Sequence, residues 1–372
     1  MLAWLFLGTF AVGSGELLVA GLLNLISGDL RVSVPAAGLL VTANAVGLAV
    51  GGPILTVLTL GVRKRRLLAC ALAAYLLANL TPVLIPNYQL FLGARVFGGA
   101  VQGLFVAAAF GAAADHVAPE RRGRAVAVIL TGFTIAATVG VPAGTLAGQA
   151  VGWRGSFTIV VVLTALVLLA APMMLPTLEA SKRTAGHVKD AFAPKVLALL
   201  GLVVLIFAAV SSVLTYIVPL LRNVTGVSAS TVSVFLFVYG VASAVGSIGG
   251  GRLADANSSR TCMVGTVGLT VSLGALYASR AIPTLVLLAI LAWGLFAFGM
   301  GPALQYRVIG LAGAAKDLAA ALPASAANSG IAIGSAVGGA AIAALDTSAA
   351  IAAGLSFAAL AVCSAWMTKG LE

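Results

Sequence analysis

Residues 2–26 read LAWLFLGTFAVGSGELLVAGLLNLI, an apolar run with one charged residue, Glu16, near its middle. About 20 apolar residues are enough for a helix to cross the hydrocarbon core of a bilayer. The run is too long for the apolar part of a signal peptide, and no basic residue precedes it. It therefore predicts a membrane-spanning helix with a carboxyl group inside the membrane.

The composition of the whole chain has the same character. Of the 372 residues, 61% are hydrophobic and 8% are charged, and the mean hydropathy is +1.13. A soluble domain carries roughly 45–50% apolar and about 25% charged residues. These values exclude a soluble enzyme, a disordered chain and a nucleic-acid-binding protein, and they predict a multi-pass protein of the lipid bilayer.

Apolar runs between polar residues predict an all-α membrane protein with about twelve transmembrane helices. Twelve spans of about 22 residues would use about 264 residues, which leaves only short loops and no room for a soluble domain. The expected spans are 2–26, 36–60, 67–86, 88–114, 124–150, 155–178, 195–219, 229–251, 261–281, 283–306, 318–345 and 347–367.

A polar stretch divides these spans into six and six. We expect residues 179–194 to form a cytoplasmic linker between an N-terminal half, 1–178, and a C-terminal half, 195–372. Glycines recur at similar offsets in the two halves, since Gly51 and Gly250 lie 199 residues apart and Gly144 and Gly338 lie 194 apart. Two related six-span halves are a known transporter architecture.

The basic residues predict the orientation in the membrane. With both termini in the cytoplasm, sixteen of the 21 Lys and Arg residues, Arg307 among them, lie in inner loops, four lie in outer loops and Arg95 lies within a span. This asymmetry satisfies the positive-inside rule. The net charge of +11 is thus explained by topology, and we expect no nucleic-acid partner.

Two charged residues, Glu16 and Arg95, lie inside predicted spans. An ionised side chain at the bilayer centre costs about 2.5–3.5 kcal/mol on insertion scales, so such residues line a cavity, find a partner or, for a carboxyl, take up a proton. Glu16 is therefore predicted to carry a proton in one state and to sense substrate in another. Arg95 would interact with Glu16 or with exposed carbonyls near Pro142. A passive acid or a purely structural ion pair is the alternative.

Small residues recur at every fourth position in corresponding spans of the two halves. Such stripes allow two helix backbones to touch in lipid. Static helix packing is one interpretation, and interfaces that rock during transport are the other. The residues are Gly132, Gly140 and Gly144, with Pro142 between them, in the fifth span, and Gly330, Gly334 and Gly338 in the eleventh.

Uncharged polar residues within spans are candidates for a substrate cavity, although each could instead bond a neighbouring helix. The candidates are Asn44, Gln102, Ser212, Tyr216, Tyr239 and Asn328. Acidic residues at span ends are expected to cap helices or to be solvated. They are Asp29, Asp115 and Asp346.

The sequence shows no pattern of a catalytic or metal site. It has no HExxH, phosphate-binding loop or nucleophile elbow, and its three cysteines lie in apolar segments without a CxxC pair. His116 and His187 lie in predicted loops far apart in the sequence. We therefore expect no enzymatic activity, no bound metal and no cofactor.

Several motifs resemble the drug:proton antiporter branch of the major facilitator superfamily. Arg95-Val-Phe-Gly-Gly99 resembles its fourth-span motif, and Gly132-(x7)-Gly140-Val-Pro142-Ala-Gly144 its fifth-span antiporter motif, which is typical of exporters. Gly251-Arg252-Leu-Ala-Asp255 matches the loop motif after the eighth span. The first-half counterpart is Gly52-Pro-Ile-Leu followed by Arg63, Lys64, Arg65 and Arg66, and it lacks the usual Asp.

The beginning of the chain, Gly-Ser-Gly-Glu16 followed by Val34-Pro-Ala-Ala-Gly-Leu-Leu, resembles chloramphenicol exporters and, near them, sugar and purine-nucleoside exporters. The resemblance implies an antiporter of a bacterial inner membrane that works by alternating access and is driven by the proton gradient. Its partners would be protons and a small amphipathic molecule, with chloramphenicol as one candidate, and we expect a monomer.

Under this resemblance, Glu16 and Arg95 couple protons to transport, and the glycine stripes form the moving interfaces. Arg63, Lys64, Arg65 and Arg66 would act with Arg252 and Asp255 at the cytoplasmic gate. The nearer alternative is an exporter of sugars, nucleosides or other metabolites with the same machinery. The farther one is a membrane sensor or enzyme.

Overall fold

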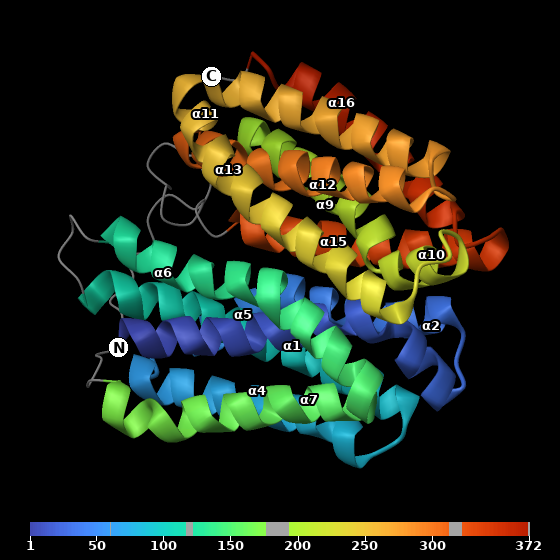
Figure 1. The fold of residues 1–372 in the computed structure, drawn as a ribbon. Coiled ribbons are helices and arrows are strands. Elements are labelled where there is room, and N and C mark those ends of the chain that lie inside the picture. The colour runs from blue at the N-terminus through green and yellow to red at the C-terminus, as the bar shows by residue number, and fades with distance from the viewer. Residues whose placement is uncertain (60, 117–121, 176–192, 312–321, 371–372) are drawn as a thin grey trace. The chain divides into compact units, whose positions relative to one another are not determined.

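The computed structural model describes residues 1–59, 61–116, 122–175, 193–311 and 322–370, with the backbone alone for 114–116 and 122–127. Within these ranges every regular element is a helix (Figure 1). Most of the predicted linker, 179–194, and the side chain of Asp115 lie outside the described part.

Twelve apolar spans are present among the described residues. Ten helices are long and apolar enough to cross a membrane, and two of them, Val128–Met174 and Ala229–Ala278, have 47 and 50 residues. A helix of that length would measure about 70–75 Å, twice the thickness of a bilayer core. Each is in fact two helices joined at a kink, at Gly152 and at Asn257 respectively. The predicted all-α architecture is therefore confirmed, with tighter connections than expected after the fifth and eighth spans.

The first of two compact units comprises Met1–Val32 and Ala43–Arg183. In this unit α1 packs against α5, α6 and α7, and α4 packs against α5 and α7. Its elements are α1 (Leu2–Leu30), the π-helical segment η1 (Gly47–Gly51), α3 (Gly52–Leu58), α4 (Lys64–Leu84), α5 (Tyr88–His116), α6 (Arg122–Ile135), the π-helical segment η3 (Ala136–Gly140) and α7 (Val141–Met174).

The second unit comprises Ser33–Thr42 and Thr184–Glu372. Helix α2 (Val34–Val46) is divided between the units after Thr42, and the Thr42 hydroxyl shares a 2.7 Å hydrogen bond with the Ser335 hydroxyl of the second unit. The remaining elements are α9 (Pro194–Leu214), α10 (Ile217–Asn223), α11 (Ala229–Ala278), α12 (Pro283–Gly299), α13 (Gly301–Leu311), α15 (Leu322–Ala344) and α16 (Ala349–Met367). The predicted halves, 1–178 and 195–372, remain a prediction.

Two prolines explain the π-helical segments of the first unit. Pro53 and Pro142 lack an amide hydrogen, and a proline ring clashes with the carbonyl four residues before it, which here belongs to Ala49 and Thr138. Both carbonyls lie in the π-helical segments, η1 and η3. A wider turn accommodates the ring without ending the helix, and π turns often lie beside functional sites.

The core of the first unit is built around α1. Trp4 and Leu5 are fully buried, and the Trp4 indole donates a 2.7 Å hydrogen bond to the Val167 carbonyl of α7. The same cluster includes Tyr75 of α4 and Phe105 of α5. Because three helices close on α1, a polar group in its middle is held between protein surfaces rather than in lipid.

One expectation about the loops was wrong. Arg307 was expected in an inner loop, but it lies within α13 and is only 4% exposed. The tenth span continues to Leu311 because Val308 and Leu311 pack on Val196 and Leu199 of α9 and so extend the apolar helix past the arginine. The Arg307 guanidinium donates a hydrogen bond to the Thr368 carbonyl.

Candidate functional site

Glu16 is the fifteenth residue of the 29-residue α1 and thus lies at the middle of the span. It is partly buried, and Gly13, Ser14 and Gly15 before it are buried. Gly15 has no side chain because α4 is too close: a methyl group there would lie 2.5 Å from the Tyr75 hydroxyl. The small residues therefore let neighbouring helices bring polar groups up to the carboxyl.

Gln102 of α5 is the direct partner of Glu16. Its side-chain Nε2 donates a hydrogen bond to Glu16 Oε2, and Gln102 is fully buried. Asn44 of α2, 2% exposed, donates from Nδ2 to Gln102 Oε1 over 3.5 Å. The Asn44 Oδ1 atom is buried with no hydrogen-bond partner among the described residues. One amide thus links the carboxyl of α1 to a polar residue of α2.

Arg95 lies on the same face of α5 as Gln102, since seven residues make almost two helical turns. It is 4% exposed, and its guanidinium donates to two successive carbonyls of α1, that of Gly15 at 3.0 Å and that of Glu16 at 3.1 Å. The guanidinium and the Glu16 carboxyl also interact electrostatically. Arg95 therefore places a positive charge beside the mid-membrane acid.

Helix α4 supplies two further polar residues, Tyr75 and Asn79, and sequence reasoning missed Tyr75. Tyr75, fully buried, donates from its hydroxyl to the Val12 carbonyl at 2.8 Å. Asn79, one turn later, donates to the Tyr75 carbonyl at 2.9 Å. Two polar residues four apart in an apolar span were the available signal, because such residues share a helix face.

Together these residues form a polar cluster inside the first unit that can exchange a proton. Glu16 is its one carboxyl group among the residues named, and it faces an amide donor and a guanidinium. No group of three His, Cys, Asp or Glu side chains that could hold a metal ion occurs in the described part of the chain. The chemistry offered is protonation and hydrogen bonding.

The other predicted cavity residues belong to the second unit. The Ser212 hydroxyl donates to the carbonyls of Ala208, at 2.8 Å, and Gly334, at 3.1 Å, and the Tyr216 hydroxyl donates to the Ser335 carbonyl at 2.8 Å. Both hydroxyls are thus engaged in helix packing. Asn328 of α15 donates to the Ala324 carbonyl, and its Oδ1 atom is buried without a partner among the described residues.

Tyr239 of α11 contacts Trp293 of α12, with ring centroids 4.8 Å apart. The Tyr239 hydroxyl and the Trp293 indole nitrogen are both buried and have no hydrogen-bond partner among the described residues. This pair lies in the second unit, whereas the Glu16 cluster lies in the first.

The glycine stripes pack within their own units. A methyl group on Gly140 would lie 2.7 Å from the Ser14 hydroxyl of α1, and one on Gly338 would lie 2.7 Å from the Ser212 carbonyl of α9. Gly132 and Gly144 likewise face α1, and Gly330 and Gly334 face α9. The stripes join α1 to its neighbours and α9 to α15, and their movement during transport remains a prediction.

The predicted gate residues differ in exposure. Arg63 and Arg66 are exposed, whereas Lys64 is 8% exposed at the start of α4, and Arg65 donates to the Pro172 carbonyl of α7 at 3.0 Å. In the second unit Arg252 and Asp255 are both exposed within α11. A gating role for these residues stays a prediction.

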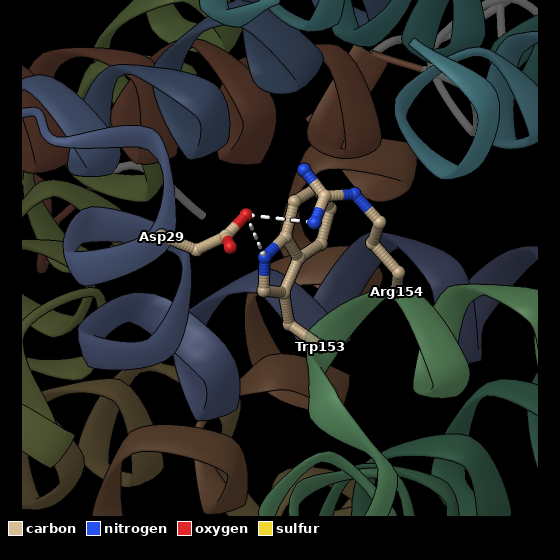
Figure 2. Close-up of polar contacts among 3 residues, drawn as sticks. All are labelled: Asp29, Trp153 and Arg154. Carbon is tan, nitrogen blue, oxygen red and sulfur yellow. Dashed lines mark hydrogen bonds and ion pairs between the residues drawn. The ribbon is translucent and has the colours of Figure 1, made fainter. Parts of the chain in front are cut away.

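An ion pair connects the end of α1 to α7 (Figure 2). Asp29 Oδ2 lies 2.8 Å from Arg154 NH1 and accepts a hydrogen bond from the Trp153 indole at 3.1 Å. The Arg154 guanidinium also lies over the Trp153 ring, 4.6 Å from its centroid. The sequence placed Asp29 at a span end, and its partner in the predicted outer loop was not foreseen. Asp346, also at a span end, accepts from the amides of Ser348 and Ala349.

Comparison with known proteins identifies the family. The model of the Major Facilitator Superfamily matches residues 5–322. The MFS-type transporter YtbD of Bacillus subtilis is 33% identical over 342 residues, which are 90% of this chain and 86% of that one. The inner membrane transport protein YdhP of Escherichia coli K12 is 32% identical over 344 residues, which are 90% of this chain and 86% of that one. A chloramphenicol resistance protein of Streptomyces lividans is 30% identical over 336 residues, which are 88% of this chain and 85% of that one.

Solved structures share the fold at low sequence identity. A bacterial homologue of the human lysosomal transporter Spinster, in an inward-facing and occupied conformation, gives a TM-score of 0.81 at 16% identity and covers 99% of this chain and 96% of that one. The human organic anion transporter MFSD10 gives a TM-score of 0.70 at 16% identity, and the match covers 99% of this chain and 98% of that one. The chain is a multi-pass membrane transporter rather than an enzyme, and it belongs to the Major Facilitator Superfamily.

Proposed function

We propose that this transporter is a proton-coupled exporter of a small amphipathic molecule and that Glu16 is its proton carrier. The observation that carries the proposal is the position of Glu16: a carboxyl group at mid-span, hydrogen-bonded to Gln102 and next to the buried Arg95. Ionisable residues inside a membrane commonly mark proton pathways in transporters.

The cluster around Glu16 offers two hydrogen-bond arrangements. With Glu16 ionised, Gln102 donates its amide hydrogen to the carboxylate and accepts from Asn44 through its oxygen. A protonated Glu16 is itself a donor, so Gln102 would turn its oxygen toward it and its NH2 group toward Asn44. Asn44 Oδ1, which has no partner among the described residues, would accept that hydrogen bond.

Such a change gives proton binding a structural consequence. A proton shifts a conformational equilibrium only if it interacts differently with the two states. Asn44 lies two residues after Thr42, where α2 passes from one compact unit to the other. Protonation of Glu16 would therefore be transmitted through Gln102 to the helix shared by the two units and favour one state of an alternating-access cycle.

The direction of transport and the substrate rest on the family comparison. A Streptomyces relative is named a chloramphenicol resistance protein, and the fifth-span motif around Gly140, Pro142 and Gly144 resembles that of exporters. We place the protein in a bacterial inner membrane with both termini in the cytoplasm, acting as a monomer on protons and one small-molecule substrate. Arg63–Arg66, Arg252 and Asp255 would act at the cytoplasmic gate.

The test is chloramphenicol accumulation in a pump-deficient bacterium that expresses the chain, with and without a protonophore. Glu16→Gln keeps the shape of the side chain and removes the exchangeable proton. Asp346→Asn is the matched control, because it makes the same change at a helix end whose capping oxygen is retained.

We expect low accumulation in cells with the unaltered protein or the Asp346 variant, and high accumulation after protonophore treatment or with Glu16→Gln. Equal accumulation with Glu16→Gln, at equal membrane abundance, would remove Glu16 as carrier. Protonophore-insensitive export would show a different energy source, and absence of chloramphenicol export would point to a metabolite substrate.

A further inference from the structure

Two aromatic side chains of the second unit carry buried polar atoms with no partner. Tyr239 is the eleventh residue of α11 and Trp293 the eleventh of α12, so both lie well inside their spans. Trp293 is fully buried and Tyr239 is 8% exposed. Neither the Tyr239 hydroxyl nor the Trp293 Nε1 atom makes a hydrogen bond to another described residue.

This pair departs from the other buried Tyr and Trp side chains. The indoles of Trp4 and Trp153 donate to Val167 O and Asp29 Oδ2, at 2.7 and 3.1 Å. The hydroxyls of Tyr75 and Tyr216 donate to the carbonyls of Val12 and Ser335, both at 2.8 Å. Buried Tyr and Trp usually find such partners, so two unpaired donors in one ring contact require an explanation of their own.

The surrounding residues hold the two rings in place but accept no hydrogen bond from their polar atoms. The ring planes meet at 54°, and Phe298 packs edge-on against Tyr239 with centroids 6.2 Å apart. The Ser243 hydroxyl donates to the Tyr239 carbonyl at 2.7 Å. Its side chain also lies close enough to the Tyr239 hydroxyl to interact with it, although the two form no hydrogen bond of good geometry. The helices also touch closely here, because a methyl group on Gly294 would lie 2.8 Å from that carbonyl. Neighbouring helices therefore offer neither donor a hydrogen-bond acceptor.

We propose that Tyr239 and Trp293 form a substrate-binding pair that donates hydrogen bonds to an uncharged, planar molecule bearing acceptor oxygens. An indole N–H can only donate, so the ligand must present an acceptor such as a carbonyl or nitro oxygen. The pair offers ring faces and dipoles but no formal charge, so a charged ligand would lose its hydration without compensation. The proposal rests on the proposed function, since the ligand is the exported substrate.

The probe is radiolabelled chloramphenicol, an uncharged aromatic molecule with nitro, hydroxyl and amide oxygens. Its equilibrium binding to the purified full chain is measured without a proton gradient. Trp293→Phe and Tyr239→Phe remove one donor each and keep an aromatic ring. Trp4→Phe makes the same change where the donor is paired within the protein.

We expect Trp293→Phe and Tyr239→Phe each to weaken binding by about tenfold, the value of one lost hydrogen bond. The thermal stability of the ligand-free protein should stay equal or rise in these variants, because an unpaired buried donor is removed. Trp4→Phe should lower thermal stability and leave the affinity of the folded fraction unchanged.

The proposal is overturned if unaltered protein does not bind chloramphenicol up to the solubility limit, or if it binds and both donor-removing variants retain its affinity. It is also overturned if these variants lose stability as Trp4→Phe does, because the donors would then be structural. Since binding is measured at equilibrium, a failure of proton coupling in the Glu16→Gln experiment leaves this result untouched, and the reverse also holds.

Discussion

Gln102 of α5 donates a hydrogen bond to the carboxyl group of Glu16 at the centre of α1. The bond is made by a fully buried amide to a partly buried acid, and the same amide accepts from Asn44. Hydrogen bonds to charged groups are worth about 1.5–3 kcal/mol. Because this contact is strong, we expect a change in the protonation of Glu16 to alter the hydrogen bonds of Gln102 first.

Replacement of Gln102 by Leu should therefore reduce proton-driven export. Leu is apolar and leaves the carboxyl without its donor, which costs about 1–3 kcal/mol for a buried group. The measurement is the protonophore-sensitive efflux rate of Gln102→Leu, Glu16→Gln and the double variant. Because both residues act in one contact, the double variant should be little worse than either single one. Additive losses would show that the residues act independently.

Arg95→Lys should lower both stability and transport, although the charge is kept. The guanidinium donates to two successive carbonyls, those of Gly15 and Glu16, and a lysine ammonium cannot reproduce that planar fork. Arg280→Lys is the control, since Arg280 also donates to a carbonyl, that of Tyr277, but at the end of a span. Thermal unfolding of the purified proteins should show a clear loss for Arg95→Lys and almost none for Arg280→Lys. Unchanged stability of Arg95→Lys would mean that the positive charge alone is needed at this position.

The sequence located the acid, the arginine and the helices, but it left their contacts open. A charge in an apolar run is visible in the sequence, which therefore offers Arg95 two kinds of partner, Glu16 or carbonyls near Pro142. The carbonyls that Arg95 contacts are those of Gly15 and Glu16, a detail that depends on the packing of α5 on α1. Tyr75 gave a weaker signal, the spacing of four to Asn79, because its partner Val12 is 63 residues away and accepts the hydrogen bond through a backbone carbonyl.

The unpaired polar atoms of Tyr239 and Trp293 could not be predicted either, because the sequence does not show which residues are in contact. Both residues look like ordinary packing aromatics in the sequence, and only the three-dimensional contacts show that their polar atoms lack partners. Arg307 shows the opposite case: it seemed to end a span, but apolar contacts of Val308 and Leu311 carry the helix past it. Local charge predicts span ends well only where the following residues have nothing apolar to pack against.

The two glycine stripes should respond differently to the addition of one methyl group. At Gly338 a methyl would lie 2.7 Å from the Ser212 carbonyl and 3.1 Å from its Cα atom, both backbone atoms that cannot move alone. At Gly144 the nearest atoms belong only to the end of the flexible Leu18 side chain. Gly338→Ala should therefore destabilise the protein by about 1–3 kcal/mol, and Gly144→Ala by clearly less. If Gly338→Ala unfolded at the same temperature as the unaltered protein, α9 and α15 would be able to separate enough for a methyl group at no cost.

The Asp29–Arg154 ion pair should contribute little to stability. The two side chains are 43% and 33% exposed, so water screens much of their attraction. Exposed pairs contribute about 0–1 kcal/mol. Asp29→Asn, which still accepts the hydrogen bond of the Trp153 indole, should thus lower the unfolding temperature only slightly, and the difference from the unaltered protein should shrink at high salt. A large, salt-independent loss would assign Asp29 a role beyond this pair.

Gly152 is the residue that allows the chain to turn between the fifth and sixth spans, so that Trp153 and Arg154 reach Asp29. Its φ of 78° and ψ of 159° lie in a region that is essentially restricted to glycine. A methyl group there would meet no atom within 4 Å, so any cost of Gly152→Ala comes from backbone strain alone. We expect a loss of about 1–3 kcal/mol. Gly201→Ala is the matched control, because it also points into open space but lies in regular helix α9 and should be neutral or stabilising. Unfolding temperatures of the two purified variants decide the matter, and equal values would show that the turn tolerates an ordinary backbone conformation.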